Sequence, residues 1–283
     1  MTSNHDNTDD NGNQDGQSSE DQGMSIIDHM IELRNRLGFC VAVFLVIFIG
    51  SLIRPFGTDS KNFADVLFLF LQAPLAAELE EQGGRMIFTA LHEAFFTQIK
   101  VAFFAALFVS FPVILLQIWR FVAPGLYANE KNAFLPFLVA TPILFFLGGA
   151  MVYYLVIPLA WDFFLSFQIT GGASSLSIEV EPRISEYLSL VMRLIFAFGI
   201  AFELPVILLL LARAGIITAR GMARNRKYAI LFSFIAAAIL TPPDVISQVM
   251  LAIPVIFLYE MSIIAARIMV KTPDYDDEDD NID

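Results

Sequence analysis

Charged residues are scarce in this chain of 283 residues. Asp, Glu, Lys and Arg make up 16% of it, whereas a soluble domain carries about 25%. The mean hydropathy is +0.65, and 57% of the residues are hydrophobic. This composition excludes an ordinary soluble enzyme and predicts that most of the chain lies in an apolar solvent.

The residues from which reactive or metal sites are built are nearly absent. Cys40 is the only cysteine, which excludes a disulfide framework and a cysteine metal cluster. His29 and His92 are expected on opposite sides of a membrane and His5 in the N-terminal tail, so we expect no metal and no cofactor. We find no Gly-rich phosphate loop and no nucleophile paired with a base. The chain is therefore predicted not to be an enzyme.

Basic residues are missing from both ends of the chain. Residues 1–23 contain six acids and residues 272–283 contain seven, with no Lys or Arg in either segment. A polar, acidic start is not expected of a cleaved signal peptide. We predict two disordered, solvated tails, 1–23 and 272–283, around one membrane domain, 24–271.

Six long segments are almost free of charge and predict six transmembrane helices, since a span needs about 20 apolar residues. They are 37–53, 101–119, 133–161, 194–212, 228–243 and 245–259. The last two, with 16 and 15 residues, are predicted to be short spans. A further apolar stretch, 66–77, contains Pro74 and is predicted to be an amphipathic helix at the outer interface or packed over the spans.

Lys and Arg are divided unevenly between the two sets of loops. Eleven lie on the side of the termini and six on the other side, so the positive-inside rule predicts that both termini are cytoplasmic. Five of the eleven fall in 213–227, which is most simply a topology signal, the alternative being a lipid or substrate site.

Proline is frequent inside the predicted spans. Each such proline removes a backbone donor and frees the carbonyl four residues earlier, which then needs a partner in a neighbouring helix or a wet cavity. The six are Pro112, Pro136, Pro142, Pro158, Pro205 and Pro254. The predicted fold is thus an all-α membrane bundle of six kinked helices with a concave shape.

Glu203 stands in the middle of a predicted span, with nine uncharged residues on either side. Burial at this depth favours the neutral acid and is costly, which marks a candidate functional residue. Its acceptor would be the Ala201 carbonyl, freed by Pro205, or a polar group on a partner helix. A structural hydrogen bond inside the bundle is the alternative.

Two segments on the predicted cytoplasmic side carry carboxylates. Glu32 is four residues from both Asp28 and Arg36, so the three share one helical face. The loop 120–132 contains Phe121 and Glu130, which suit a basic, partly apolar peptide. The alternatives are an interfacial helix that sets topology for the first segment and interfacial aromatic anchoring for the second.

Four segments together resemble the TatC family, the multispan component of the twin-arginine protein translocase. They are HMIELRNR at 29–36, FVAPGLY at 121–127 with Glu130, FGIAFELP at 198–205 and LTPPDVISQ at 240–248. Their order and spacing match the family over roughly residues 24–271. Met30 departs mildly, because the family more often has Leu there.

The resemblance implies a receptor and core subunit for the export of folded proteins across the bacterial plasma membrane, driven by the proton motive force. It implies that Glu32 and Glu130 bind signal peptides with two adjacent arginines, because carboxylates pair bidentately with guanidinium groups. Phe121 would hold the apolar part of the peptide, and Arg34 would orient Glu32 or act separately from it.

The resemblance also implies a hetero-oligomer in membrane lipid, with no nucleic acid among its partners. Glu203 would contact a polar residue of single-span TatA/TatB-type subunits. The final hairpin, with Pro243, Asp244 and Gln248, would offer these subunits a second docking surface.

A proton-coupled small-molecule transporter with Glu203 as the carrier acid is the alternative function. Transporters typically contain internal repeats, whereas the predicted spans differ in length and pattern. An intramembrane hydrolase, the third class, lacks candidate residues.

Overall fold

The computed structural model describes residues 26–54, 61–81, 84–126, 131–166, 181–240 and 245–269. Both predicted acidic tails lie outside these residues. Helices make up nearly all of the described chain, and one isolated parallel β-bridge joins Ile87 to Arg183. The predicted all-α fold is confirmed.

Five helical segments among the described residues are long and apolar enough to cross a membrane. A sixth apolar helix, α9, has 15 residues and is short, as predicted. The spans are built from α1 (Ile26–Leu52), α3 (Leu91–Leu126), α4 (Lys131–Met151) with the π-helical η1 (Val152–Val156) and α5 (Ile157–Leu165), α6 (Ile184–Ala201) with α7 (Leu204–Arg213), α9 (Arg226–Leu240) and α10 (Val245–Met269). A span count of six stays a prediction.

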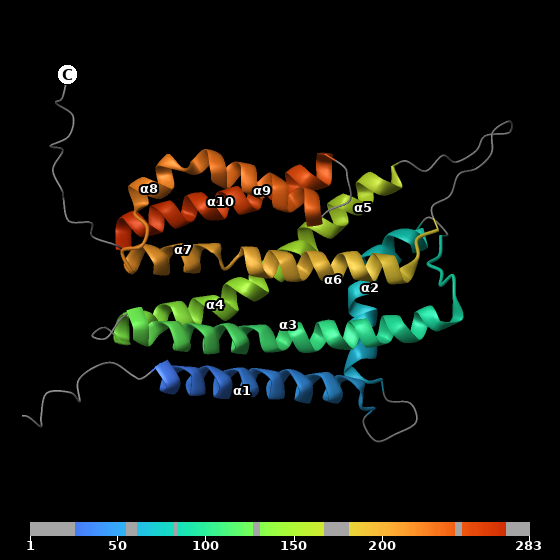
Figure 1. Ribbon diagram of the computed structural model, residues 1–283. Coiled ribbons are helices and arrows are strands. Elements are labelled where there is room, and N and C mark those ends of the chain that lie inside the picture. The colour runs from blue at the N-terminus through green and yellow to red at the C-terminus, as the bar shows by residue number, and fades with distance from the viewer. Residues whose placement is uncertain are drawn as a thin grey trace, which may run out of the picture.

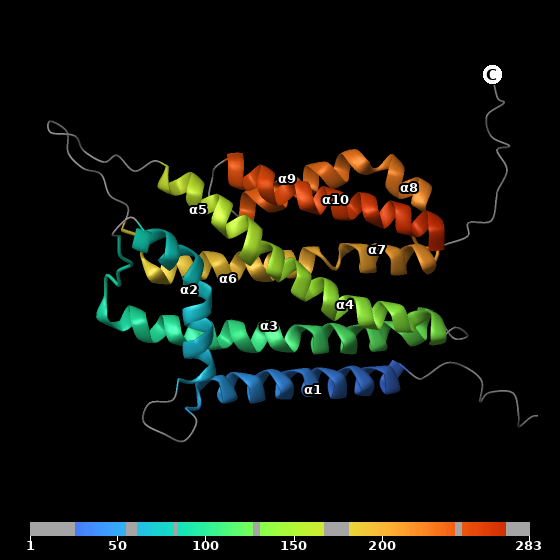
Figure 2. The ribbon, with the colours of Figure 1, turned by 180° about the vertical axis from the view of Figure 1, so that it is seen from behind.

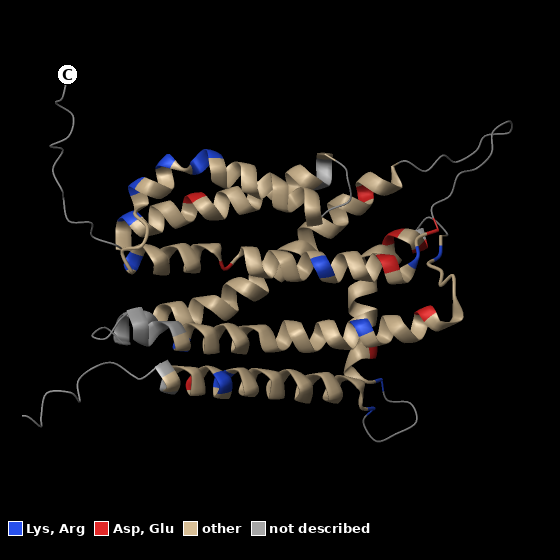
Figure 3. Ribbon diagram, in the orientation of Figure 1, with Lys and Arg blue, Asp and Glu red and all other residues tan. Residues whose placement is uncertain are grey.

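The long helices lie side by side in the order α1, α3, α6–α7 and α10, and the segment from α4 to α5 crosses them obliquely (Figures 1 and 2). The short helix α8 (Ala219–Arg224) joins α7 to α9. Lys and Arg gather at the end of the bundle where α8 lies and where α7 and α10 end (Figure 3). We refer to this end, at which α1 begins, as the basic end.

The final helix is longer than predicted. Counting uncharged residues ended the last span at Tyr259, but α10 continues to Met269. The interruption is Glu260, whose carboxylate forms a bidentate ion pair with Arg226 at the start of α9, at 2.7 and 2.9 Å. Because this pairing compensates the charge, the helix continues past it. The prediction of two short final spans is therefore wrong for α10.

Helix α2 (Phe63–Glu81) runs across the bundle instead of along it (Figure 2). Its buried residues Leu71, Leu75 and Leu79 are spaced four apart and so form one face of the helix. This face packs against α3, α5 and α6, and α2 also contacts α1. The apolar stretch 66–77 thus packs over the spans, which is one of the two predicted alternatives.

The carbonyl that Pro74 frees in α2 has found a partner. The carbonyl of Phe70, four residues earlier, accepts a hydrogen bond from the hydroxyl of Tyr153 in η1 at 2.8 Å. The next carbonyl, that of Leu71, accepts one from the Tyr187 hydroxyl of α6, also at 2.8 Å. Two tyrosines therefore satisfy the backbone of α2 where its proline interrupts the helical ladder.

Helices α4 and α6 approach closely through glycines. A Cβ on Gly199 of α6 would lie 2.5 Å from the ring of Phe145 in α4, and a Cβ on Gly148 of α4 would lie 2.6 Å from the carbonyl oxygen of Phe198 in α6. Each glycine thus makes room for a phenylalanine or its backbone on the facing helix. This joint fixes the position of the C-terminal end of α6.

Glu93 ties together the end of the bundle opposite the basic end. Its carboxylate accepts hydrogen bonds from the backbone N–H groups of Thr89 and Ala90 at 2.7 and 3.2 Å. It also accepts one from the Ser185 hydroxyl at the start of α6, and Arg183 lies 3.4 Å away. One buried carboxylate therefore joins the beginning of α3 to the beginning of α6.

Candidate functional site

A polar pocket opens at the basic end between α1 and α3. It has a volume of 540 Å³ and is lined by Ile31, Glu32, Asn35, Arg36, Phe39, Gln117 and Arg120. α1 is one continuous helix from Ile26, so the segment for which an interfacial helix was the alternative is an extension of the first span. This continuity places Glu32 rigidly beside α3.

Glu32 is engaged by Arg36 one turn further along α1. The Arg36 Nε donates to Glu32 Oε1 at 2.9 Å, and Nη2 donates to the same oxygen. The third nitrogen of the guanidinium, Nη1, donates to Oε1 of Gln117 in α3 at 3.2 Å. The Glu32 side chain remains 28% exposed and that of Arg36 23%, so both are reachable from solvent.

The predicted role of Arg34 is not borne out by these contacts. Arg34 donates to the side chain of the adjacent Asn35 at 3.5 Å, whereas Glu32 is oriented by Arg36. The reason is helical spacing: residues four apart share a face and residues two apart do not. The orienting residue is Arg36, which was predicted only to share the face of Glu32.

Phe121 contacts α1 through the ring of His29, a residue that the sequence did not indicate as part of this site. The imidazole of His29 stacks on Phe121 with 4.2 Å between ring centroids and 19° between planes. His29, Glu32 and Arg36 are separated by intervals of three and four residues, so they occupy one face of α1. The structure thus brings Phe121 to the same helical face as Glu32.

Four further residues were predicted at the peptide site and at the final hairpin. Glu130, Pro243 and Asp244 lie outside the described residues, and their roles stay predictions. Gln248 is described: its side-chain amide donates to the carbonyl of Phe234 in α9 at 3.1 Å. It therefore holds α10 to α9 within the final hairpin.

Glu203 lies at the break between α6 and α7. Its backbone N–H donates to the carbonyl of Ile200 at 3.0 Å, and α7 begins at the next residue with Pro205 in its first turn. The side chain is 1% exposed. Proline explains the break, because it cannot donate to the ladder.

The Glu203 carboxyl has one polar neighbour among the described residues, the hydroxyl of Thr141 in α4. By strict geometry neither carboxyl oxygen nor this hydroxyl forms a hydrogen bond with a described residue, and the Ala201 carbonyl, one of the two predicted acceptors, is not used. An unsatisfied buried polar group costs about 1–3 kcal/mol. The Glu203 carboxyl therefore retains hydrogen-bonding capacity for an external partner.

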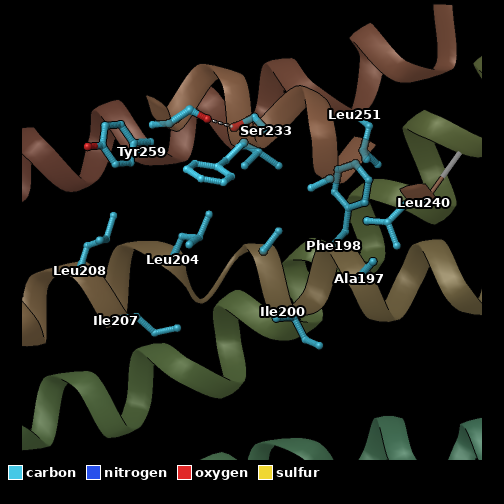
Figure 4. A pocket seen from close by; sticks show the side chains of 15 residues that line it. Ala197, Phe198, Ile200, Leu204, Ile207, Leu208, Ser233, Leu240, Leu251 and Tyr259 are labelled. Atoms are coloured by element: carbon cyan, nitrogen blue, oxygen red, sulfur yellow. Dashed lines mark hydrogen bonds between the residues drawn. The ribbon is translucent and has the colours of Figure 1, made fainter. Parts of the chain in front are cut away.

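A second pocket, of 410 Å³, lies between α6–α7 and the α9–α10 hairpin (Figure 4). Its lining is apolar except for two hydroxyls, and both are used within the chain. Ser233 donates to the carbonyl of Ala229 at 2.7 Å, and Tyr259 donates to that of Met222 at 2.9 Å. Ala201 and Leu204, on either side of Glu203, line this pocket, and Glu203 itself does not.

The fold and the two polar sites define a multispan helical membrane protein with a carboxylate pocket at one end and a buried carboxyl inside the bundle. Comparison with known proteins gives the family. The family model "Sec-independent protein translocase protein (TatC)" matches residues 28–254. The chain belongs to the TatC family, as its four motifs predicted.

Relatives and solved structures agree with this assignment. The chain is 52% identical over 247 residues to the Sec-independent protein translocase protein TatC of Magnetococcus marinus, covering 87% of this chain and 85% of that protein. It is 39% identical to the TatC of Escherichia coli strain K12, with 87% and 89% covered. A crystal structure of the twin arginine translocase receptor TatC in DDM has 37% identity and a TM-score of 0.71, covering 84% of this chain and 99% of that one.

Proposed function

We propose that this chain is the receptor and core subunit of a twin-arginine translocase, which binds signal peptides with two adjacent arginines and exports folded proteins. The single observation that carries the proposal is the state of Glu32. Its carboxylate, in an open pocket at the basic end, is bound to a guanidinium through two nitrogens of Arg36. The pocket is thus already shaped for the chemical group that a twin-arginine peptide presents.

The chemistry of the pocket favours arginine over lysine. A guanidinium presents several donors in a fixed plane, whereas an ammonium is a compact point charge. The face formed by His29 and Phe121 is apolar enough to receive the hydrophobic part of a signal peptide. Glu130 is proposed as the second carboxylate, one for each arginine.

Glu203 is proposed to meet a polar side chain of a single-span TatA/TatB-type subunit. The support is physical: the buried carboxyl has only the Thr141 hydroxyl as a polar neighbour among the described residues, forms no hydrogen bond of standard geometry with it, and lies at a helix break. A donor supplied by a partner would satisfy them. Both termini are proposed to be cytoplasmic, in a bacterial plasma membrane whose proton motive force drives export.

Crosslinking of a signal peptide tests the receptor function. In membranes that contain the full chain, a twin-arginine peptide with a photoreactive group is expected to crosslink to the wild type and not to Glu32→Ala. Glu80→Ala, which removes an exposed carboxylate from α2, is the control and should crosslink normally. Equal crosslinking of Glu32→Ala and wild type, at equal protein levels, would refute the site.

A further inference from the structure

The acceptor atom of the proposed receptor site, Oε1 of Glu32, already accepts hydrogen bonds from another residue of this chain. Two nitrogens of Arg36 converge on Oε1 of Glu32, and no described residue donates to Oε2. An incoming guanidinium can therefore touch only the outer oxygen until Arg36 moves. Binding at this site is an exchange of one arginine for another.

The structure also provides the place to which Arg36 can withdraw. Its Nη1 already donates to Gln117 Oε1 in α3, at 3.2 Å. A rotation that releases Glu32 keeps this contact, so the guanidinium is not left without an acceptor. Gln117 belongs to α3 and Glu32 to α1, and the two acceptors therefore hold Arg36 from opposite sides of the pocket.

The charges of the described pocket lining support the same exchange. The lining contains one carboxylate, Glu32, and two guanidinium groups, Arg36 and Arg120. With Arg36 in place, a cationic ligand meets an excess of positive charge, and like charges at this separation repel. Because Arg36 stays in the pocket through Gln117, its movement frees the Glu32 carboxylate without removing the positive charge, which lowers the affinity for every cationic ligand.

We propose that Arg36 is an internal competitor that sets the affinity of this site by occupying Glu32 in the free protein. This inference rests on the receptor function proposed above. Every ligand that binds the Glu32 carboxylate has to displace the same two hydrogen bonds first. The internal competitor therefore lowers the affinity for all cationic peptides by the same factor, and the preference for arginine comes from the geometry of the carboxylate alone.

The test measures peptide binding to the purified full chain by fluorescence anisotropy. The probes are a synthetic signal peptide with Arg-Arg and the same peptide with Lys-Lys. Arg36→Gln is expected to bind the Arg-Arg peptide about three- to tenfold more tightly, the range expected for losing a competing charge-assisted contact. The Lys-Lys peptide should gain by the same factor, so that the preference for Arg-Arg is unchanged.

Two further variants separate the explanations. Arg267→Gln removes the same charge from the exposed end of α10 and should bind both peptides like the wild type. Arg36→Lys keeps the charge without the planar fork, and its affinity for both peptides should lie between those of the wild type and Arg36→Gln. Thermal melting of each variant establishes that it is folded.

The outcomes are distinguishable. If Arg36→Gln binds more weakly than wild type or equally well, Arg36 only orients Glu32 and the competition is refuted. An affinity of Arg36→Lys equal to that of the wild type refutes the role of the guanidinium. Glu32→Gln separately addresses the receptor site: if it binds the Arg-Arg peptide as tightly as wild type, the proposed function fails at this residue whatever Arg36 does.

Discussion

The hydroxyl of Tyr153 reaches across from η1 to the backbone of α2, where it donates to the carbonyl of Phe70 at 2.8 Å. The same ring stacks on the ring of Phe70, with 4.2 Å between centroids. One side chain thus supplies both a polar and an apolar contact to the turn that Pro74 interrupts. The crossing helix is held where its own ladder is weakest.

Tyr153→Phe separates these two contacts. The ring stack is retained, and the Phe70 carbonyl loses its donor in a region where lipid supplies none. We expect the free energy of unfolding to fall by about 1 kcal/mol, measured by thermal melting in detergent. Tyr154→Phe is the control, because Tyr154 is 71% exposed, and an equal loss in both variants would contradict the assignment.

Gly199→Ala is expected to be severely destabilising. The added Cβ would lie 2.5 Å from a carbon of the Phe145 ring, and overpacking of this kind costs about 1–3 kcal/mol. Gly50→Ala in α1, where a Cβ meets nothing within 4 Å, should be neutral or slightly stabilising, because Ala has the higher helix propensity. Melting temperatures of the two variants provide the comparison, and a tolerated Gly199→Ala would argue against the close joint.

Substitutions of Glu203 should distinguish hydrogen bonding from charge. Glu203→Gln keeps a neutral group that can donate and accept, and it should support assembly with single-span subunits better than Glu203→Ala, which keeps neither. Co-purification of tagged subunits with each variant is the measurement. Equal recovery with Gln and Ala would mean that the carboxyl is not the point of contact.

Loss of the Glu93 carboxylate should loosen the end of the bundle opposite the basic end. Glu93→Ala leaves the N–H groups of Thr89 and Ala90 and the Ser185 hydroxyl without their acceptor, so the segment before α3 loses its connection to the start of α6. Limited proteolysis should then cut near residues 84–90 more rapidly. Glu186→Ala, which removes a carboxylate that is 69% exposed and pairs with the same Arg183, should leave the cutting rate unchanged.

Most of the helical architecture can be predicted from where charges are absent. The uncharged runs located the six apolar helices and identified 66–77 as a segment that does not cross. The sequence prediction made the last helix too short because the count of uncharged residues stops at the first charged residue. Whether Glu260 is tolerated depends on Arg226, which is 34 residues earlier in the chain and approaches only when α9 packs on α10.

The candidate site likewise contains residues that local sequence predicts and residues whose roles depend on how the helices pack. Glu32 and Phe121 were predicted from local spacing and motif, and both lie at the basic end of α1 and α3. Gln117 and His29 were missed because their roles arise from the packing of α1 on α3, which the sequence of neither helix records. That Arg36 contacts Glu32 and Arg34 does not was predictable from helical spacing alone, since residues three or four apart lie on one face and residues two apart do not.

The interlocking of Gly148 with Phe198 and of Gly199 with Phe145 has a mechanical consequence. Two helices that interlock in this way cannot shift by a turn or rotate about their axes without first separating. α4 and α6 therefore behave as one rigid pair. The break in the helical hydrogen-bond ladder at Glu203 and Pro205 lies directly beyond this rigid pair, so a change of angle between α6 and α7 has to occur at the break and has to separate α7 from α10, against which it packs.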